Sequence, residues 1–198
     1  MSSKQYDRAY FDRWYRGAGM GDRHELARKV AMAVAVAEYH LGRPVQSVLD
    51  IGCGEAACRA PLLALRPGID YLGFDSSQYA VRRYGRTRSI GYACFGDFEH
   101  LRPCPPVDLL VCSDVLHYLD DAELRRGLPG MVELTGGVAF LEVFCAGDDP
   151  EGDHEDFHAR TAAYYRRRLT RLGMRQVGSY CWLSPMLAEH AAALELAQ

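Results

Sequence analysis

The sequence contains no hydrophobic run long enough to cross a membrane and no large excess of charge of either sign. An apolar stretch over residues 31–37 is followed at once by Glu38, whereas a membrane-spanning helix needs about 20 apolar residues. Residues 1–7 lack the apolar core of a secretory signal peptide. A formal net charge of −3 over 198 residues does not favour nucleic acid or an anionic membrane as a partner. We therefore expect a cytoplasmic protein that binds neither.

The sequence also lacks any Cys-x-x-Cys pair, although it contains seven cysteines. An odd number of cysteines without such a pair argues against a structural zinc site and against the disulfide framework of a secreted domain. We expect reduced and mostly buried thiols, and no bound metal. The chain has no internal repeat and no low-complexity segment, and its length and composition favour one domain.

Apolar segments alternate with amphipathic segments along the chain, which is the pattern of a parallel sheet covered by helices. The expected strands are residues 47–51, 71–75, 91–96, 108–113, 137–144 and 175–183. The expected helices are residues 6–15, 23–41, 55–65, 77–84, 121–131, 161–172 and 185–196. The predicted fold class is therefore α/β: a doubly wound, mostly parallel sheet of seven or six strands with helices on both faces.

The most informative stretch is residues 48–54, Val-Leu-Asp-Ile-Gly-Cys-Gly, an apolar run that ends in an acid and two glycines. It predicts a strand, a tight turn and the start of a helix, where backbone N–H groups favour an anionic ligand group. Gly52 and Gly54 let a ligand approach where side chains would block it, and Cys53 lies between them. Asp50 adds a negative charge at the same place. We therefore expect a ligand with both a cationic and an anionic group, as in an amino acid.

Polar residues also follow the next three strands and are expected to meet at the same crevice. The second strand ends at Asp75, with Ser76 after it, and an acid at this position accepts hydrogen bonds from ribose hydroxyls. Asp97 follows the third strand beside Phe98, a pair suited to an exocyclic amine and a stacked purine. The fourth strand ends at Ser113. Together these residues predict that the ligand is an adenosyl amino acid.

The order of these residues resembles that of the class I S-adenosylmethionine-dependent methyltransferases. The resemblance rests on D-x-G-x-G at residues 50–54 and on the two acids Asp75 and Asp97. Residues 114–119, Asp-Val-Leu-His-Tyr-Leu, also resemble the fourth motif of that family. The similarity extends from about residue 48 to residue 174. One departure is an alanine at position 56, where the family usually has a third glycine, and its small side chain is not expected to prevent binding.

The resemblance implies S-adenosyl-L-methionine as cofactor and S-adenosyl-L-homocysteine as product. The residues expected to contact the cofactor are Asp50, Gly52, Cys53, Gly54, Asp75, Ser76, Asp97, Phe98 and Ser113. The resemblance also implies a single methyltransferase domain over residues 1–198. Its parts would be an N-terminal helical lid (1–44), a Rossmann-like core (45–184) and a C-terminal helix (185–198).

Other interpretations of these motifs stay open from the sequence. The loose G-x-G-x-x-A at residues 52–57 is compatible with a dinucleotide such as NAD, although that fingerprint does not need acids after the third and fourth strands. The turn could also be purely structural. Asp75 could cap the helix that follows it, and Asp97 could be an ordinary loop acid.

Three histidines are candidate catalytic bases. His117 follows the fourth strand, where it could take a proton from a hydroxyl or an amine, because imidazole titrates near pH ~6.5. Alternatively, it packs in the core or positions the ligand. His154 and His158 lie in the acidic segment 148–158 and are alternative bases. That segment could hold a divalent metal, but we favour a solvated loop over the acceptor.

Aromatic residues are the candidate acceptor contacts. The N-terminal helix is rich in them, and such a helix either packs on the sheet or closes over the ligands and excludes water. The resemblance favours the lid, in which Tyr10 and Trp14 would face the acceptor. Tyr118, after the fourth strand, and Tyr164, in the helix after the fifth, would complete the pocket.

The acceptor itself is not encoded in a motif. Residues 112–115 read Cys-Ser-Asp-Val where an N-P-P-Y motif would stand, so methylation of adenine N6 or of glutamine is disfavoured. We therefore expect methyl transfer to an oxygen or nitrogen of a small molecule. Two other functions stay open: a catalytically inactive partner or sensor that binds the cofactor, and an RNA or protein methyltransferase.

Overall fold

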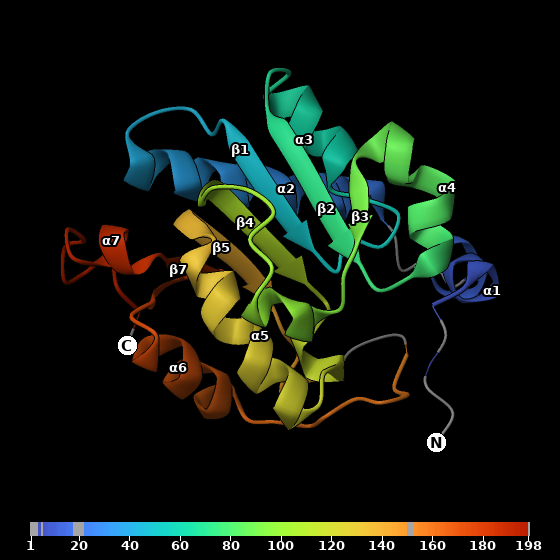
Figure 1. Cartoon of the computed structure of the whole chain (residues 1–198). Helices are drawn as coiled ribbons and strands as arrows, with labels where there is room; N and C mark the ends of the chain where they lie inside the picture. Colours follow the sequence, from blue (N-terminus) through green and yellow to red (C-terminus); the bar gives the residue numbers. More distant parts are fainter. Residues whose placement is uncertain (1–3, 5, 18–21, 150–152, 198) are drawn as a thin grey trace.

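One β-sheet organises the computed structural model, which describes residues 4, 6–17, 22–149 and 153–197. Within those residues, seven strands run in the order β3-β2-β1-β4-β5-β7-β6 (Figure 1). The strands are β1 (Ser47–Ile51), β2 (Asp70–Asp75), β3 (Ile90–Tyr92), β4 (Val107–Ser113), β5 (Thr135–Glu142), β6 (Arg175–Gly178) and β7 (Cys181–Leu183). All pairings are parallel except those of β7 with β5 and β6. The predicted fold class is confirmed, with seven strands.

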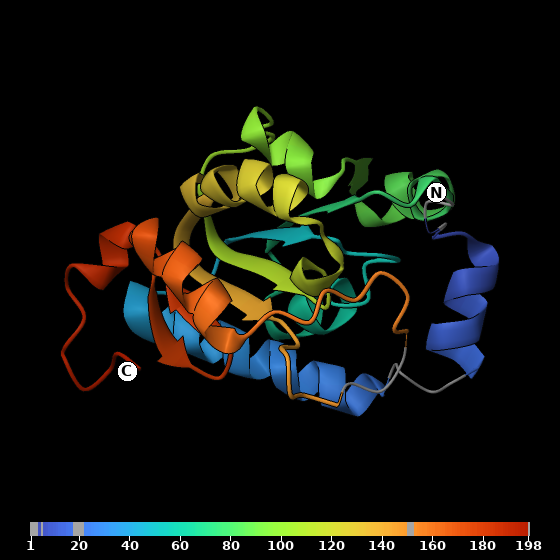
Figure 2. The ribbon, with the colours of Figure 1, turned by 90° about the horizontal axis from the view of Figure 1, so that it is seen from below.

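Helices cover both faces of this sheet (Figure 2). They are α1 (Arg8–Phe11), α2 (Arg23–Leu41), α3 (Arg59–Leu65), α4 (Gln78–Arg88), α5 (Asp121–Glu133), α6 (Ala162–Arg171) and α7 (Pro185–Ala188). Side chains of α2 and α3 pack in one apolar cluster, and those of α5 and α6 pack in another on the opposite face. The three-layer arrangement explains why β4 is an almost continuous apolar run, because both of its faces are buried.

The strand order reverses between β1 and β4, which are neighbours at the centre of the sheet. In open parallel sheets, ligands bind in the crevice beyond the carboxyl ends of the strands at such a reversal. The segments that follow β1, β2 and β4 therefore lie at one edge of the sheet. These are the segments in which the sequence predicts ligand contacts.

Helix α5 packs unusually closely on the 3₁₀ helix η2 (Phe95–Glu99), which follows β3. Two glycines of α5 make this possible. A Cβ atom at Gly127 would lie 2.3 Å from the carbonyl oxygen of Phe95, and one at Gly130 would lie 1.8 Å from that of Phe98. Backbone therefore meets backbone here, and the position of η2 is fixed by the surface of α5.

Three predicted elements differ in extent from those of the structure. The expected last strand, residues 175–183, is a hairpin of β6 and β7 that turns at Ser179 and Tyr180, whose φ angles are +48° and +62°. The expected C-terminal helix is only the short α7. Helix α3 begins at Arg59 rather than Glu55, because a turn occupies residues 54–58.

The predicted N-terminal helix and third strand are also each divided into two elements. Helix α1 continues as a π-helical turn, η1 (Asp12–Gly17). Strand β3 is short and is followed by η2, so residues 95–96 of the expected strand are helical. A third short turn, η3 (Leu116–Tyr118), follows β4.

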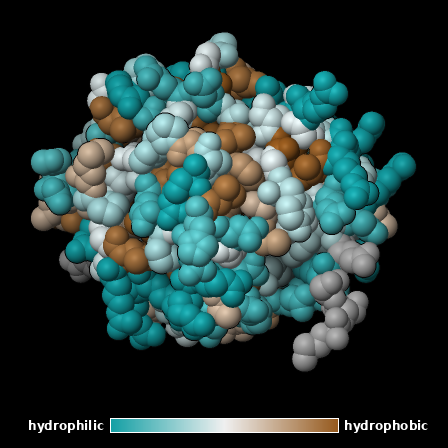
Figure 3. Space-filling model, viewed as in Figure 1, coloured by the Kyte–Doolittle hydropathy of each residue, from teal (hydrophilic) through white to brown (hydrophobic). Residues whose placement is uncertain are grey.

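The face that Figure 3 presents is mostly hydrophilic, with apolar side chains in separate patches. Among the residues that the structure describes, no helix has the length and apolar character needed to span a bilayer.

We predict that Gly130→Ala destabilises the fold. The added methyl group would meet the Phe98 carbonyl at 1.8 Å, and overpacking of this kind typically costs about 1–3 kcal/mol. The free energy of unfolding, measured by urea titration, should fall by that amount.

Gly68→Ala is the matched control, because a Cβ at Gly68 has no heavy atom within 4 Å. Its effect should stay within about 0.5 kcal/mol, as for ordinary surface changes. Equal unfolding midpoints for the two variants would contradict the close packing of α5 on η2.

Candidate functional site

The turn after β1 has a backbone shape that favours glycine. Gly52 and Gly54 have φ angles of +72° and +54°, a region that glycine enters without steric cost. A Cβ at Gly52 would also lie 2.2 Å from a methyl group of Val115, so the turn contacts the segment after β4. Ala56 has φ +57° as well, which is strained for alanine and gives a physical reason for a glycine there in the family.

Asp50 is buried at the end of β1, with 3% of its surface exposed. It accepts a hydrogen bond of 2.7 Å from the hydroxyl of Tyr71 on β2. Burial raises the pKa of Asp50 to about 7, and the negative charge of Asp75 adds to this effect, while the Tyr71 hydrogen bond opposes it. A cation bound nearby would stabilise the charged carboxylate, because opposite charges favour ionisation.

Asp75 joins the ends of β1 and β2. One of its oxygens accepts the N–H of Gly54 and the other accepts the N–H of Ser77, each at 2.7 Å. Burial raises the pKa of Asp75, and these two backbone hydrogen bonds oppose the rise. Ser77 is the N-cap of α4, so Asp75 stabilises the turn and the start of the helix, and Ser76 is exposed beside it.

Asp97 and Phe98 lie on η2 but differ in their surroundings. Asp97 is exposed and accepts the N–H of Cys94 at 2.8 Å. Phe98 has 0% of its surface exposed and packs edge-to-face on Phe74, with ring centroids 5.9 Å apart. The expectation that a purine stacks on the Phe98 ring is therefore wrong, because that ring is a core side chain; its backbone remains beside Asp97.

His117 is a fully buried residue at the end of β4. Its Nδ1 accepts the N–H of Phe144 at 3.3 Å, and its Nε2 lies 3.0 Å from Oδ1 of Asp114. The second contact has a poor hydrogen-bond angle, so Nε2 has no hydrogen-bond partner among the described residues. Both nitrogens face the protein, and this arrangement favours the alternative in which His117 packs in the core over a base that touches the acceptor.

The two other predicted bases lie in the loop after β5. His154 is exposed, and His158 is half-buried. The backbone N–H of His158 donates to the carbonyl of His117 at 2.8 Å, which fixes this loop to the end of β4. Among residues 4, 6–17, 22–149 and 153–197, no group of three or more His, Cys, Asp or Glu side chains is arranged to hold a metal.

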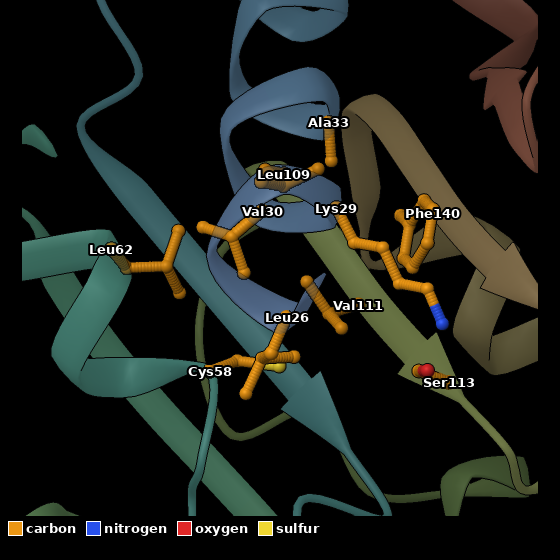
Figure 4. A pocket seen from close by; sticks show the side chains of 10 residues that line it. All are labelled: Leu26, Lys29, Val30, Ala33, Cys58, Leu62, Leu109, Val111, Ser113 and Phe140. Carbon is orange, nitrogen blue, oxygen red and sulfur yellow. The ribbon is translucent and has the colours of Figure 1, made fainter. Parts of the chain in front are cut away.

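Ser113 donates a hydrogen bond of 2.6 Å to Glu142, whose other oxygen lies 2.7 Å from the ammonium of Lys29. Ser113 and Lys29 also line one end of a narrow apolar pocket beneath α2 (Figure 4). Glu142 is buried at the end of β5. Sequence reasoning missed Glu142, and the available signal was an acid at the end of a buried strand.

The N-terminal segment lies against the turn after β1. The Phe11 ring is buried and would lie 3.2 Å from a Cβ at Gly54. Arg16 forms an ion pair of 2.7 Å with Glu55. The segment that the sequence analysis named a lid thus contacts the glycine turn, while Cys53 lies buried between the two glycines.

The four predicted acceptor residues have three different surroundings. Tyr10 and Tyr118 both lie beside the ammonium of Lys4. Trp14 is half-buried and stacks with Arg13, whose Cζ is 4.9 Å from the ring centre. Tyr164 donates to Asp121 at the start of α5, so of the four residues the structure brings together Tyr10 and Tyr118.

The fold is that of a doubly wound α/β protein, and the candidate ligand residues lie beyond β1, β2 and β4. Residues 49–135 match the family model described as a methyltransferase domain. Over 157 residues, the chain is 27% identical to the trans-aconitate 2-methyltransferase of Azoarcus sp. (strain BH72), which covers 77% of this chain and 59% of that protein. This domain family and this relative are what the chain is similar to: a methyltransferase domain over less than half of its length and one methyltransferase over most of it.

Solved structures share the fold. The magnesium protoporphyrin IX methyltransferase of Synechocystis PCC 6803, with bound S-adenosylhomocysteine, superposes with a TM-score of 0.60 and 17% identity over 83% of this chain and 84% of that one. Streptomyces venezuelae DesVI gives 0.64 and 13%, over 88% and 96%. At these identities the likeness concerns the fold alone.

We predict that Asp50→Asn changes how stability depends on pH. The folded pKa of about 7 lies above the ordinary value of 3.8, so wild-type stability is fullest below about pH 4 and falls as the pH rises towards 7. The variant loses this dependence, and its free energy of unfolding should rise relative to wild type over that range.

The relative rise is at most about 4 kcal/mol, since each pKa unit corresponds to about 1.4 kcal/mol. Urea titrations at several pH values, without cofactor, measure it. Asp70→Asn, at the exposed start of the neighbouring strand, is the control. It keeps Asp50, so its free energy of unfolding should follow the same pH dependence as that of wild type. Parallel curves for all three proteins would refute the raised pKa of Asp50.

Proposed function

We propose that this protein transfers a methyl group from S-adenosylmethionine to an oxygen or nitrogen of a small molecule. The observation that carries the proposal is the link between the two cofactor motifs. The Asp75 carboxylate, after β2, accepts the N–H of Gly54 in the turn after β1 at 2.7 Å. The family match supports the same cofactor.

The residues present fit such a cofactor. Gly52 and Gly54 keep the turn free of side chains, which allows close approach of an amino-acid moiety. Asp50 would balance the cationic part of that moiety. Asp75 and the exposed Ser76 would bind the ribose. Asp97 would accept a hydrogen bond from the adenine amine, and the backbone of Phe98, rather than its ring, would lie beside the adenine.

The cofactor, when bound, supplies a strongly electrophilic methyl group. The chain then has mainly to align the acceptor with it and to exclude water. A hydroxyl or ammonium acceptor must also lose a proton. Because both nitrogens of His117 face protein groups, we assign it to positioning Asp114 and the loop after β5. His154 and His158 remain the candidate bases.

The acceptor is proposed to be a small molecule, and the domain is proposed to extend over the whole chain with residues 1–44 as its lid. The chain spans 59% of the length of the curated relative described above, and the acceptor of that relative therefore does not carry over directly. Trans-aconitate is one acceptor to test among hydroxyl, amine and carboxylate compounds. A cytoplasmic location is part of the same proposal. Formation of S-adenosylhomocysteine with any acceptor would exclude an inactive binding protein.

We predict that S-adenosylmethionine and S-adenosylhomocysteine bind saturably in calorimetric titrations and that NAD does not. Asp75→Asn should weaken both by about 10- to 100-fold, because a hydrogen bond to a charged group contributes about 1.5–3 kcal/mol. Asparagine retains one oxygen acceptor for the backbone N–H groups, so this variant is preferable to alanine.

Asp70→Asn is again the matched control, because it changes an exposed acid at the other end of the same strand. Its affinity for the cofactor should equal that of wild type. If neither adenosyl compound binds to wild type, or if NAD binds instead, the methyltransferase proposal fails.

A further inference from the structure

The ammonium group of Lys4 lies inside a cage of three tyrosine rings. Its Nζ atom is 4.1 Å from the ring centre of Tyr118, 5.4 Å from that of Tyr6 and 5.6 Å from that of Tyr10. All three distances are within the range of cation–π attraction, about 6 Å. Only 5% of the Lys4 side chain is exposed. We call Tyr6, Tyr10, Tyr118 and Asp153 the tyrosine cage.

Two oxygen acceptors complete the cage. The Lys4 ammonium lies 2.6 Å from Oδ2 of Asp153 and donates to the carbonyl of Glu155 at 2.9 Å. Tyr118 donates its hydroxyl to the carbonyl of Asp153 at 2.7 Å, which holds the loop against the ring. Oxygen acceptors at these distances suit an ammonium that bears N–H groups, which a quaternary ammonium does not.

The cage adjoins the proposed cofactor crevice. The carbonyl of Tyr6 accepts the hydroxyl of Ser77, and the backbone N–H of Ser77 donates to Asp75. Tyr118 ends the short turn after β4. Three distant parts of the chain therefore meet there: the N-terminal segment, the end of β4 and the loop after β5.

Carboxylates predominate around the cage, although Arg13 is close enough to act on Asp153. Burial raises the pKa of Tyr6, and the carboxylates of Asp75, Asp153, Asp156 and Asp114 raise it further. The tyrosines are therefore neutral at physiological pH, and the carboxylates set the sign of the field. A cation is attracted to such a site and an anion is repelled.

We propose that the tyrosine cage is the acceptor site for an aliphatic ammonium group, and that Lys4 occupies it when no acceptor is bound. The substrate class is then a primary or secondary amine with an alkyl chain. The bound ammonium first gives one proton to a candidate base of the adjoining loop, His154 or His158, and the neutral nitrogen then takes the methyl group as the bond from sulfur to that methyl breaks and S-adenosylhomocysteine leaves. This inference rests on the proposed methyltransferase function. Lys4 is well suited to act as the internal occupant, because its side chain is itself an alkylammonium.

The composition makes the occupant directly observable. Of the 23 basic residues, Lys4 and Lys29 are the only lysines, and the others are arginine. Lysine labelled with ¹³C at Cε therefore gives two NMR signals in the full chain. Tyrosine ring currents shift the Lys4 signal, while Lys29, paired with Glu25 and Glu142, is an internal reference.

The titration uses protein saturated with S-adenosylhomocysteine and n-butylammonium as the probe. We expect the Lys4 signal to move saturably to the position of free lysine while Lys29 stays unchanged. The isosteres n-butanol and butyrate should move neither signal. Calorimetry on Lys4→Gln, which vacates the cage, should show n-butylammonium binding about 10- to 50-fold more tightly than to wild type, since the competing occupant is gone.

Asp153→Asn in the Lys4→Gln background should weaken the binding of n-butylammonium by about 10- to 100-fold. Glu155→Gln in that background should not, because the Lys4 contact there is the backbone carbonyl. Two results overturn the inference: n-butylammonium binds Lys4→Gln no better than n-butanol, or the wild-type Lys4 signal stays fixed at about 100 times the dissociation constant of Lys4→Gln. Failure of the proposed function is separate, since S-adenosylhomocysteine would then not bind before any amine is added.

Discussion

The rest of the site depends on the hydrogen bonds that the carboxylate of Asp75 accepts. This carboxylate accepts N–H groups from Gly54, in the turn after β1, and from Ser77, at the start of α4. The hydroxyl of Ser77 in turn donates a hydrogen bond to the carbonyl of Tyr6. One buried acid thus connects two strands, a helix and the N-terminal segment. Because a buried acceptor without donors is costly, the turn, the helix and the segment stabilise one another through it.

Much of the site could be predicted because its residues are adjacent to strands in a regular fold. Residues 50–54 and Asp75 end parallel strands, and parallel strands bring their carboxyl ends to one edge. Phe98 shows the limit of this reasoning. Its position after β3 was informative, but the direction of its ring depends on the packing of η2 against α5, which no local pattern reveals.

Contacts between distant segments were the least predictable. The hairpin of β6 and β7 depends on three successive residues with positive φ, Gly178, Ser179 and Tyr180. Glycine favours such a backbone, but Ser179 and Tyr180, which form the two-residue loop, give no such signal in the sequence. Tyr10 and Tyr118 were expected near the acceptor as separate aromatic contacts. Their shared position around Lys4 follows from tertiary structure, since Asp153 lies 149 residues from Lys4 in the chain.

The strands at the two borders of the sheet are its shortest or nearly so. Strand β3 has three residues and β6 has four, and β6 ends in a turn with left-handed backbone. An exposed border strand offers unpaired N–H and carbonyl groups to other chains, and short or strongly turned strands limit that template. The molecule therefore presents little edge on which a second sheet could add strands, which opposes aggregation at high concentration.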